Sequence, residues 1–125
     1  MADLRVTVDG IELEANWTDD APQTRAALAA TLPVAGEAAR WGEELYFTVP
    51  VDADSENARE VVPEGSLAYW PAGNALCLFW GATPASQNGE PRAASPVNLL
   101  ARIPDPSPLS AIDGGARVRV EHVDE

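Results

Sequence analysis

Apolar and polar residues alternate with a period of two along much of the chain, a pattern that predicts β-strands. Within one of these segments Tyr46 falls on the face opposite the apolar residues, so it is expected to point outward. The dipeptide Asp9-Gly10, between the first two segments, favours the tight turn of a β-hairpin. The strands expected from this pattern cover 4–8, 11–15, 43–51, 95–103 and 116–123.

The segment 65–86 contains no charged residue, although the rest of the chain is rich in acidic residues. It predicts two strands, 66–70 and 75–80, joined by a turn over 71–74, where a Pro and a Gly supply the backbone angles of a turn. The second of these strands carries apolar residues at every position. We therefore expect it to be buried on both faces or to line an apolar groove.

Few segments have the features of a helix. Acidic residues and Pro22 precede the Ala-rich segment 24–32, which is predicted to form a helix. Segments 55–59 and 109–112 are expected to be short helical turns, and 34–40, which is small and polar, is expected to be a loop. Seven or eight short strands with one or two helices predict a mainly β fold, a closed or nearly closed β-barrel in which residues 1–125 form a single domain.

The formal net charge of −12 limits the classes of partner. The chain has 20 acidic residues and 8 basic ones, and every basic residue is Arg. Such a surface repels phosphate groups and acidic lipids, so we expect neither nucleic-acid nor membrane binding. Two explanations fit this composition. One is adaptation to high salt (a halophilic protein), where counterions screen the repulsion; the other is an ordinary acidic protein from a GC-rich genome.

Localisation and cofactors are constrained by what the sequence lacks. No apolar run approaches the length of a membrane span, and the first residues do not resemble a signal peptide, so a cytoplasmic protein is expected. The single cysteine, Cys77, excludes an internal disulfide and is expected to be packed and inert. The one histidine, His122, is expected at the surface, and we predict neither a metal site nor a cofactor.

Four segments, 40–47, 68–73, 79–84 and 95–98, read RWGEELYF, AYWPAG, FWGATP and SPVN. In this order they resemble the cyclophilin-like proteins, and in particular a small prokaryotic branch of uncharacterised members. The resemblance implies a closed, antiparallel, eight-stranded β-barrel capped by short helices. It also implies peptidyl-prolyl cis-trans isomerase activity, because true cyclophilins isomerise X-Pro bonds with an Arg on the strand after the first helix and an apolar pocket for the proline ring.

The sequence departs from cyclophilins where that activity resides. The matching strand, 43–51, contains no Arg, and the nearest is Arg40, just before it. Two cyclophilin pocket residues, a Gln and a Phe, correspond by ungapped placement to Ala75 and Cys77, which are smaller. These departures argue against isomerase activity, so the sequence leaves open whether the protein is an enzyme.

A ligand-binding groove is the alternative site. Outward-facing Tyr46, Trp70, Cys77 and Phe79 are expected to line it, with Arg40 at its rim; alternatively, some of them are core residues sealed by loops. Asn98 is a further ligand-binding candidate, although such a residue more often satisfies loop backbone groups.

Three functions follow from this sequence. The first hypothesis is a binding module for a small apolar or proline-containing peptide ligand. The second is a peptidyl-prolyl isomerase in which Arg40 replaces the usual cation. The third is a structural or oligomerisation module, in which exposed aromatic residues bury one another in a homodimer.

Overall fold

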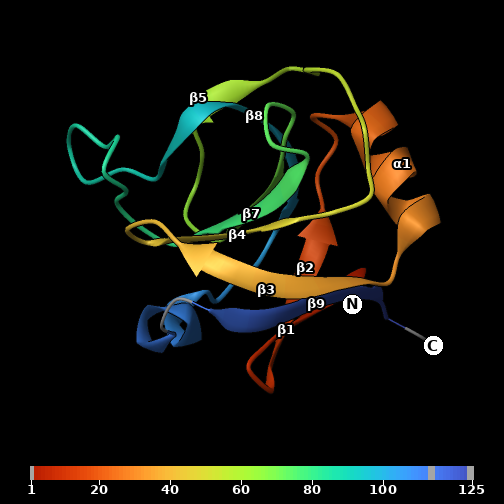
Figure 1. Ribbon diagram of the computed structural model, residues 1–125, viewed down its shortest axis with the longest axis horizontal. Helices are drawn as coiled ribbons and strands as arrows, with labels where there is room; N and C mark the ends of the chain where they lie inside the picture. Colours follow the sequence, from red (N-terminus) through yellow and green to blue (C-terminus); the bar gives the residue numbers. More distant parts are fainter. Residues whose placement is uncertain (1, 113–114, 124–125) are drawn as a thin grey trace.

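Strands dominate the architecture, seen in a computed structural model that describes residues 2–112 and 115–123 (Figure 1). Its nine strands belong to one sheet, in which every pairing is antiparallel. They are β1 (Leu4–Val8), β2 (Ile11–Trp17), β3 (Val34–Arg40), β4 (Glu44–Thr48), β5 (Arg59–Val61), β6 (Ser66–Trp70), β7 (Ala75–Phe79), β8 (Arg92–Arg102) and β9 (Ala116–His122). An α-helix, α1 (Pro22–Thr31), and a 3-10 helix, η1 (Ser107–Ala111), complete the described elements.

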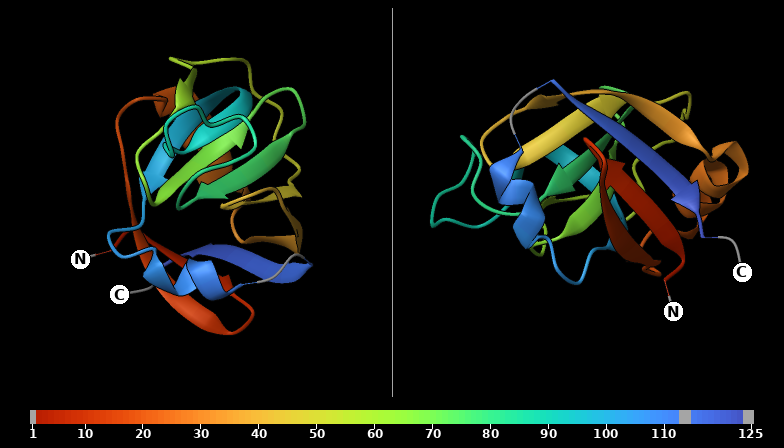
Figure 2. Two further views of the ribbon diagram at one scale, coloured as in Figure 1. Left: turned by 90° about the vertical axis from the view of Figure 1, so that its left-hand side faces the viewer. Right: turned by 90° about the horizontal axis from the view of Figure 1, so that it is seen from below.

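Eight of the strands close into a ring. The order is β2-β1-β9-β3-β4-β7-β6-β8, and β2 pairs again with β8 through Asn16 and Trp17 to complete it. β5 adds to the outer edge of β8. The helices α1 and η1 lie at opposite ends of the ring (Figure 2). The expected mainly β class, with eight antiparallel strands in a closed arrangement, is thereby confirmed.

The main hydrophobic core fills the ring. Alternate residues of β1 and β9 point into it, among them Val6 and Val120, which form a cross-strand pair and are fully buried. The predicted hairpin at Asp9-Gly10 is present, with both residues at positive φ. Because the apolar side chains of these strands face inward, the polar residues between them cover the outer surface.

The segment 34–40 is a strand, not the loop expected from its composition. It forms β3 and pairs with β9 on one side and with β4 on the other. Its residues are small because an aromatic ring packs against it: a Cβ atom on Gly36 would lie 3.2 Å from the ring of Phe47. Gly36 therefore reflects close packing, while the charged residues of the strand, Glu37 and Arg40, are exposed.

The segment 55–59 is not helical either. It runs as bends into β5, whose three residues are all exposed. Since the backbone of this stretch is tied to other elements by side chains such as Asn98, it needs no helical hydrogen bonds of its own. The expected helix at 24–32 and the helical turn near 109–112 are present as α1 and η1.

The central strand β7 is buried on both faces, as its composition predicts. Leu76 and Leu78 belong to the core inside the ring. Cys77 and Phe79 belong to a second apolar cluster outside it, with Val62, Ala68, Ala93 and Val97, against which Tyr46 and Trp70 pack. The sheet therefore separates two apolar layers at this position.

A substitution at Gly65, directly before β6, tests how closely the chain approaches the backbone of Ile103 there. Gly65 has a φ of 83°, and a Cβ atom there would overlap the carbonyl of Ile103. Gly65→Ala should lower the free energy of unfolding by about 2–4 kcal/mol in chemical denaturation. Gly89→Ala is the control, because Gly89 has the same φ of 83° but open space around it, and should cost about 1 kcal/mol. Equal losses would contradict the close approach at Gly65.

Candidate functional site

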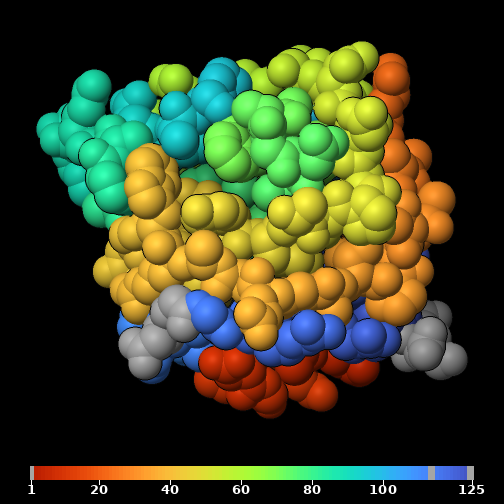
Figure 3. All heavy atoms as spheres, in the orientation of Figure 1, coloured from red at the N-terminus to blue at the C-terminus, as the bar shows by residue number. Residues whose placement is uncertain are grey.

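A pocket with a volume of about 220 Å³ opens on the outer face of the sheet. In Figure 3 the surface is hollowed between the orange-yellow end of β3, the green turn between β6 and β7, and the cyan beginning of β8. The second apolar cluster forms its base, so the pocket lies where the cover over β7 is incomplete. It is lined by Trp41, Glu44, Tyr46, Trp70, Cys77, Ala93, Ala94 and Val97.

Strand alternation places these side chains. In β4, Leu45 and Phe47 point into the core while Glu44 and Tyr46 point toward the pocket. Tyr46 pairs with Cys77 of β7, which pairs in turn with Ala68 of β6. Small residues in this cross-strand row leave space above the sheet, and the larger rings on either side enclose it.

Aromatic side chains form the walls. The rings of Tyr46 and Trp70 have centroids 6.3 Å apart and planes at 78°, an edge-to-face arrangement. The indole Nε1 of Trp70 donates a hydrogen bond of 2.6 Å to the Ser95 hydroxyl, which fixes the orientation of the ring. Trp41 adds a third ring, and its backbone N–H donates to the carbonyl of Glu44. The walls are therefore apolar and held in place by neighbouring strands.

Glu44 is the one acidic residue among the described residues that line the pocket. It is 5% exposed, and burial raises the pKa of its carboxyl to about 7, although a hydrogen bond with Cys77 partly offsets that rise. None of the ion pairs formed by the described residues involves Glu44. The carboxyl is therefore close to half ionised at neutral pH, inside an apolar site.

Cys77 lies beside this carboxyl. Burial raises the pKa of its thiol well above the ordinary value, and the charge of Glu44 raises it further. A nucleophilic cysteine needs the opposite shift, so this thiol stays protonated and acts as a small packed side chain. The sequence expectation of an inert cysteine agrees with this environment.

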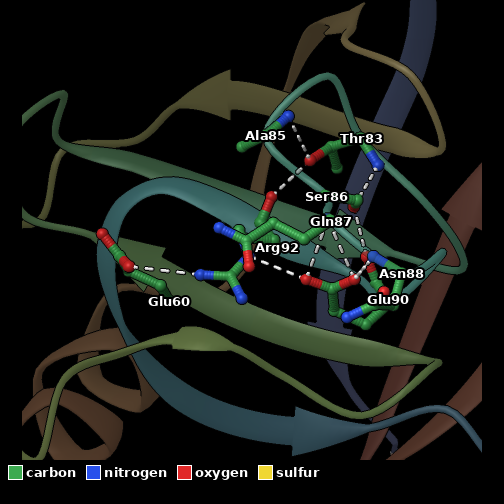
Figure 4. A network of polar contacts seen from close by, with 8 residues as sticks. All are labelled: Glu60, Thr83, Ala85, Ser86, Gln87, Asn88, Glu90 and Arg92. Carbon is green, nitrogen blue, oxygen red and sulfur yellow. Dashed lines mark hydrogen bonds and ion pairs between the residues drawn. The ribbon is translucent and has the colours of Figure 1, made fainter.

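Hydrogen bonds tie together the loop before β8 (Figure 4). This loop leads into Ala93 and Ala94 of the pocket lining. The Thr83 hydroxyl donates to the carbonyl of Arg92, directly before these alanines. The Arg92 guanidinium bonds to the carboxylate of Glu90 at 2.8 Å. Hydrogen bonds from the backbone N–H of Asn88 and from Arg92 lower the pKa of Glu90 to about 2, so its carboxylate remains charged in nearly all conditions.

The site residues expected from sequence do not all meet in this pocket. Tyr46, Trp70 and Cys77 line it. Phe79 lies in the apolar cluster beneath and is fully buried, so it supports the pocket without lining it.

Arg40 lies away from the pocket lining and is held by other groups. Its guanidinium donates to the carbonyls of Gly42 at 2.8 Å and Ile112 at 2.5 Å, and it forms an ion pair of 3.3 Å with Glu43. It also stacks over the ring of Trp80, at 5.4 Å from the centroid. These contacts fasten the end of β3 to the segment after η1.

Asn98 is buried inside the protein. Its amide donates to the Thr24 hydroxyl at 3.0 Å and to the carbonyl of Asp54 at 2.9 Å, and its carbonyl accepts from the backbone N–H of Glu56 at 2.9 Å. All of its contacts are internal, and they join α1, β8 and the segment before β5. The structural alternative considered for Asn98 describes this arrangement.

Five residues of the pocket lining were missed by sequence reasoning: Trp41, Glu44, Ala93, Ala94 and Val97. Glu44 had a detectable signal, since it lies two positions before Tyr46 and so shares its face of the strand. The alanines of β8 had none, because their place depends on the register between β8 and β6, which shifts between Leu67 and Ala68.

Outside this pocket, the other candidate sites among the described residues are less suited to a ligand. A more polar hollow of about 470 Å³ lies beside α1, but its Glu56 already caps the helix by accepting from the backbone N–H groups of Gln23 and Thr24. Within residues 2–112 and 115–123, no group of three or more acidic, His or Cys side chains is placed to hold a metal. No helix in the same ranges has the length and hydropathy of a membrane span.

The raised pKa of Glu44 predicts a pH-dependent stability. The folded protein holds this proton more tightly than the unfolded chain, so stability is present at low pH and is lost as pH rises from about 4.5 to about 7. Glu44→Gln removes the ionisation and should make the protein more stable at pH 8 by roughly 3 kcal/mol or less. Chemical denaturation at pH 5 and pH 8 measures the difference. Glu43→Gln, at a more exposed neighbour, should leave the wild-type pH dependence unchanged.

The buried network of Asn98 predicts a loss of stability. Asn98→Ala leaves three hydrogen-bonding groups without their partner and should cost about 2–4 kcal/mol in thermal or chemical unfolding. Asn88→Ala, in an exposed loop where the backbone N–H of Asn88 donates to the Glu90 carboxylate, should change stability by less than about 0.5 kcal/mol. If both variants were equally stable, Asn98 would not have the structural role described above.

Comparison with known proteins identifies the family. The model of the family described as Cyclophilin-like matches residues 2–121. A solution structure of the hypothetical protein AF2241 from Archaeoglobus fulgidus has 38% sequence identity and a TM-score of 0.78, and the alignment covers 98% of this chain and 95% of that one. No curated protein matches. The chain therefore belongs to the cyclophilin-like family, as its sequence motifs suggest.

Proposed function

We propose that this protein is a binding module that holds a small, largely apolar ligand, or an apolar peptide side chain such as proline, in the pocket on β4, β6, β7 and β8. The observation that carries the proposal is the pocket itself, a hollow of about 220 Å³ with three aromatic rings in its lining. Small-molecule sites are usually concave and mostly apolar, with few polar groups to orient the ligand. This apolar hollow contrasts with the acidic composition of the chain, whose formal net charge is −12.

Catalysis of proline isomerisation receives less support. The mechanism that the family resemblance suggests needs a cation next to the bound amide. Arg40 does not line the pocket, and its guanidinium is already bonded to two carbonyls and to Glu43. No basic side chain of the described residues lines the pocket in its place. The binding proposal needs no such cation.

The oligomerisation alternative has a weaker basis as well. It assumes exposed aromatic residues, but Tyr46 and Trp70 are partly buried and pack against the second apolar cluster. The large hydrophobic residues that are exposed in the described ranges are Ile11 and Val61. Isolated residues of this kind are common on monomeric proteins.

Two of the four tryptophans line the pocket, so ligand binding should change the intrinsic fluorescence. We expect a neutral apolar probe such as cyclohexylmethanol or N-acetylprolinamide to do so. Trp70→Leu should weaken binding about tenfold by removing one wall. Trp17→Leu is the matched control: Trp17 is also partly buried, the Arg25 guanidinium lies over its ring, and it is not part of the pocket lining. Equal affinities for the two variants, or no binding by a broad set of such probes, would overturn the proposal.

A further inference from the structure

An apolar ligand alone does not explain why the pocket contains the carboxyl of Glu44. It is 5% exposed and points into a pocket whose other described lining residues are aromatic, aliphatic or a thiol. Among the described residues it has no cationic partner and no hydrogen bond from a backbone N–H. A buried carboxylate without such partners is unfavourable, so a ligand that supplies N–H donors and positive charge would satisfy it.

The other described groups that line the pocket carry no charge to pair with Glu44. Arg40, on the paired strand β3, is bound to the carbonyls of Gly42 and Ile112 and to Glu43. Tyr46 follows Glu44 on β4, and Cys77, with its protonated thiol, faces it from β7. β6 contributes Trp70, while β8 contributes Ala93, Ala94 and Val97, none of which ionises. The charge of the site is therefore set by Glu44 and by whatever enters the pocket.

The walls favour a cation over an anion. Aromatic faces attract ammonium groups, and a carboxylate at the same site strengthens that attraction. The acidic surface of the whole chain raises the local concentration of cations and repels anions. Since no Arg lines the pocket within the described residues, an anionic ligand would find no counter-charge.

We propose that the ligand is a small primary ammonium compound with an apolar body, whose N–H groups donate to the Glu44 carboxylate while its body packs against Tyr46, Trp70 and Trp41. This inference rests on the proposed binding function and specifies its ligand class. A primary ammonium group offers three N–H donors, which suits a carboxylate whose hydrogen bond from the described residues comes from the weakly donating Cys77 thiol. Because Glu44 is partly protonated at neutral pH, binding releases a proton from it.

Matched probes test the charge directly. Cyclohexylmethylammonium, cyclohexylmethanol and cyclohexanecarboxylate share one ring and differ in the group that reaches Glu44. In calorimetric titrations, the ammonium should bind at least about tenfold more tightly than the alcohol. Its affinity should rise about tenfold between pH 6 and pH 8, in step with the ionisation of a group whose pKa is about 7, while that of the alcohol should not rise. An alkylammonium, with a pKa near 10, stays charged throughout.

Proton release gives a readout that needs no variant. At pH 7, about half a proton should be released per ammonium bound. The apparent enthalpies in phosphate and in Tris should therefore differ by about half the difference between the ionisation enthalpies of the two buffers. Glu44→Gln should abolish this difference and reduce the ammonium affinity to that of the alcohol. Glu43→Gln should preserve both. Far-ultraviolet circular dichroism checks that each variant is folded.

The outcomes separate the two proposals. Equal binding of the alcohol and the ammonium, tighter binding of the carboxylate, or absence of proton release would overturn the ammonium inference while leaving an apolar binding module in place. Failure of all three probes to bind would overturn the binding module as well. Preferential ammonium binding that survives Glu44→Gln would place the cation elsewhere and contradict the inference.

Discussion

Burial of β7 on both faces is the constraint on which the rest of this structure depends. All five residues of the strand are buried, and they separate the core inside the ring from the apolar cluster outside it. A sheet with two apolar faces must be covered on both. The ring supplies one cover, and Val62, which follows β5, supplies the other together with Ala93 and Val97 of β8. The pocket is the gap in that outer cover, so its position follows from the arrangement that stabilises the fold.

Glu44 conflicts with this arrangement. Its side chain is placed by strand alternation against an apolar layer, where an ionised carboxyl is poorly solvated. Stability alone would favour an apolar or amide side chain at this position. Ionisable groups with strongly shifted pKa values are concentrated at functional sites, which is why the carboxyl has weight in choosing the ligand class.

The strands and the family were predictable from the sequence because they depend on local alternation and on short motifs. The hairpin at Asp9-Gly10 and the two apolar faces of β7 are examples. Prediction failed where long-range contacts decide. β3 was mistaken for a loop because its pairing with β9, far along the chain, and the packing of the Phe47 ring against Gly36 leave no alternating apolar pattern in its sequence.

The candidate site also has residues that the sequence predicts and residues that it does not. Tyr46, Trp70 and Cys77 follow from strand parity, and the sequence identifies them. The sequence could not decide between a binding and a structural role for Asn98, nor give the direction of the Arg40 side chain. Both are set by tertiary hydrogen bonds, which no sequence pattern shows. The contribution of β8 to the wall depended on a register shift, which is equally invisible in the sequence.

The loop from Thr83 to Arg92 has a consequence for how the pocket behaves across the pH scale. Its Glu90 carboxylate loses its charge only near pH 2, whereas the carboxyl inside the pocket gains or loses its proton near pH 7. The two ionisations are separated by several pH units. The Glu90–Arg92 ion pair in front of the β8 wall thus keeps its charges over the whole interval in which the interior carboxyl gains or loses its proton.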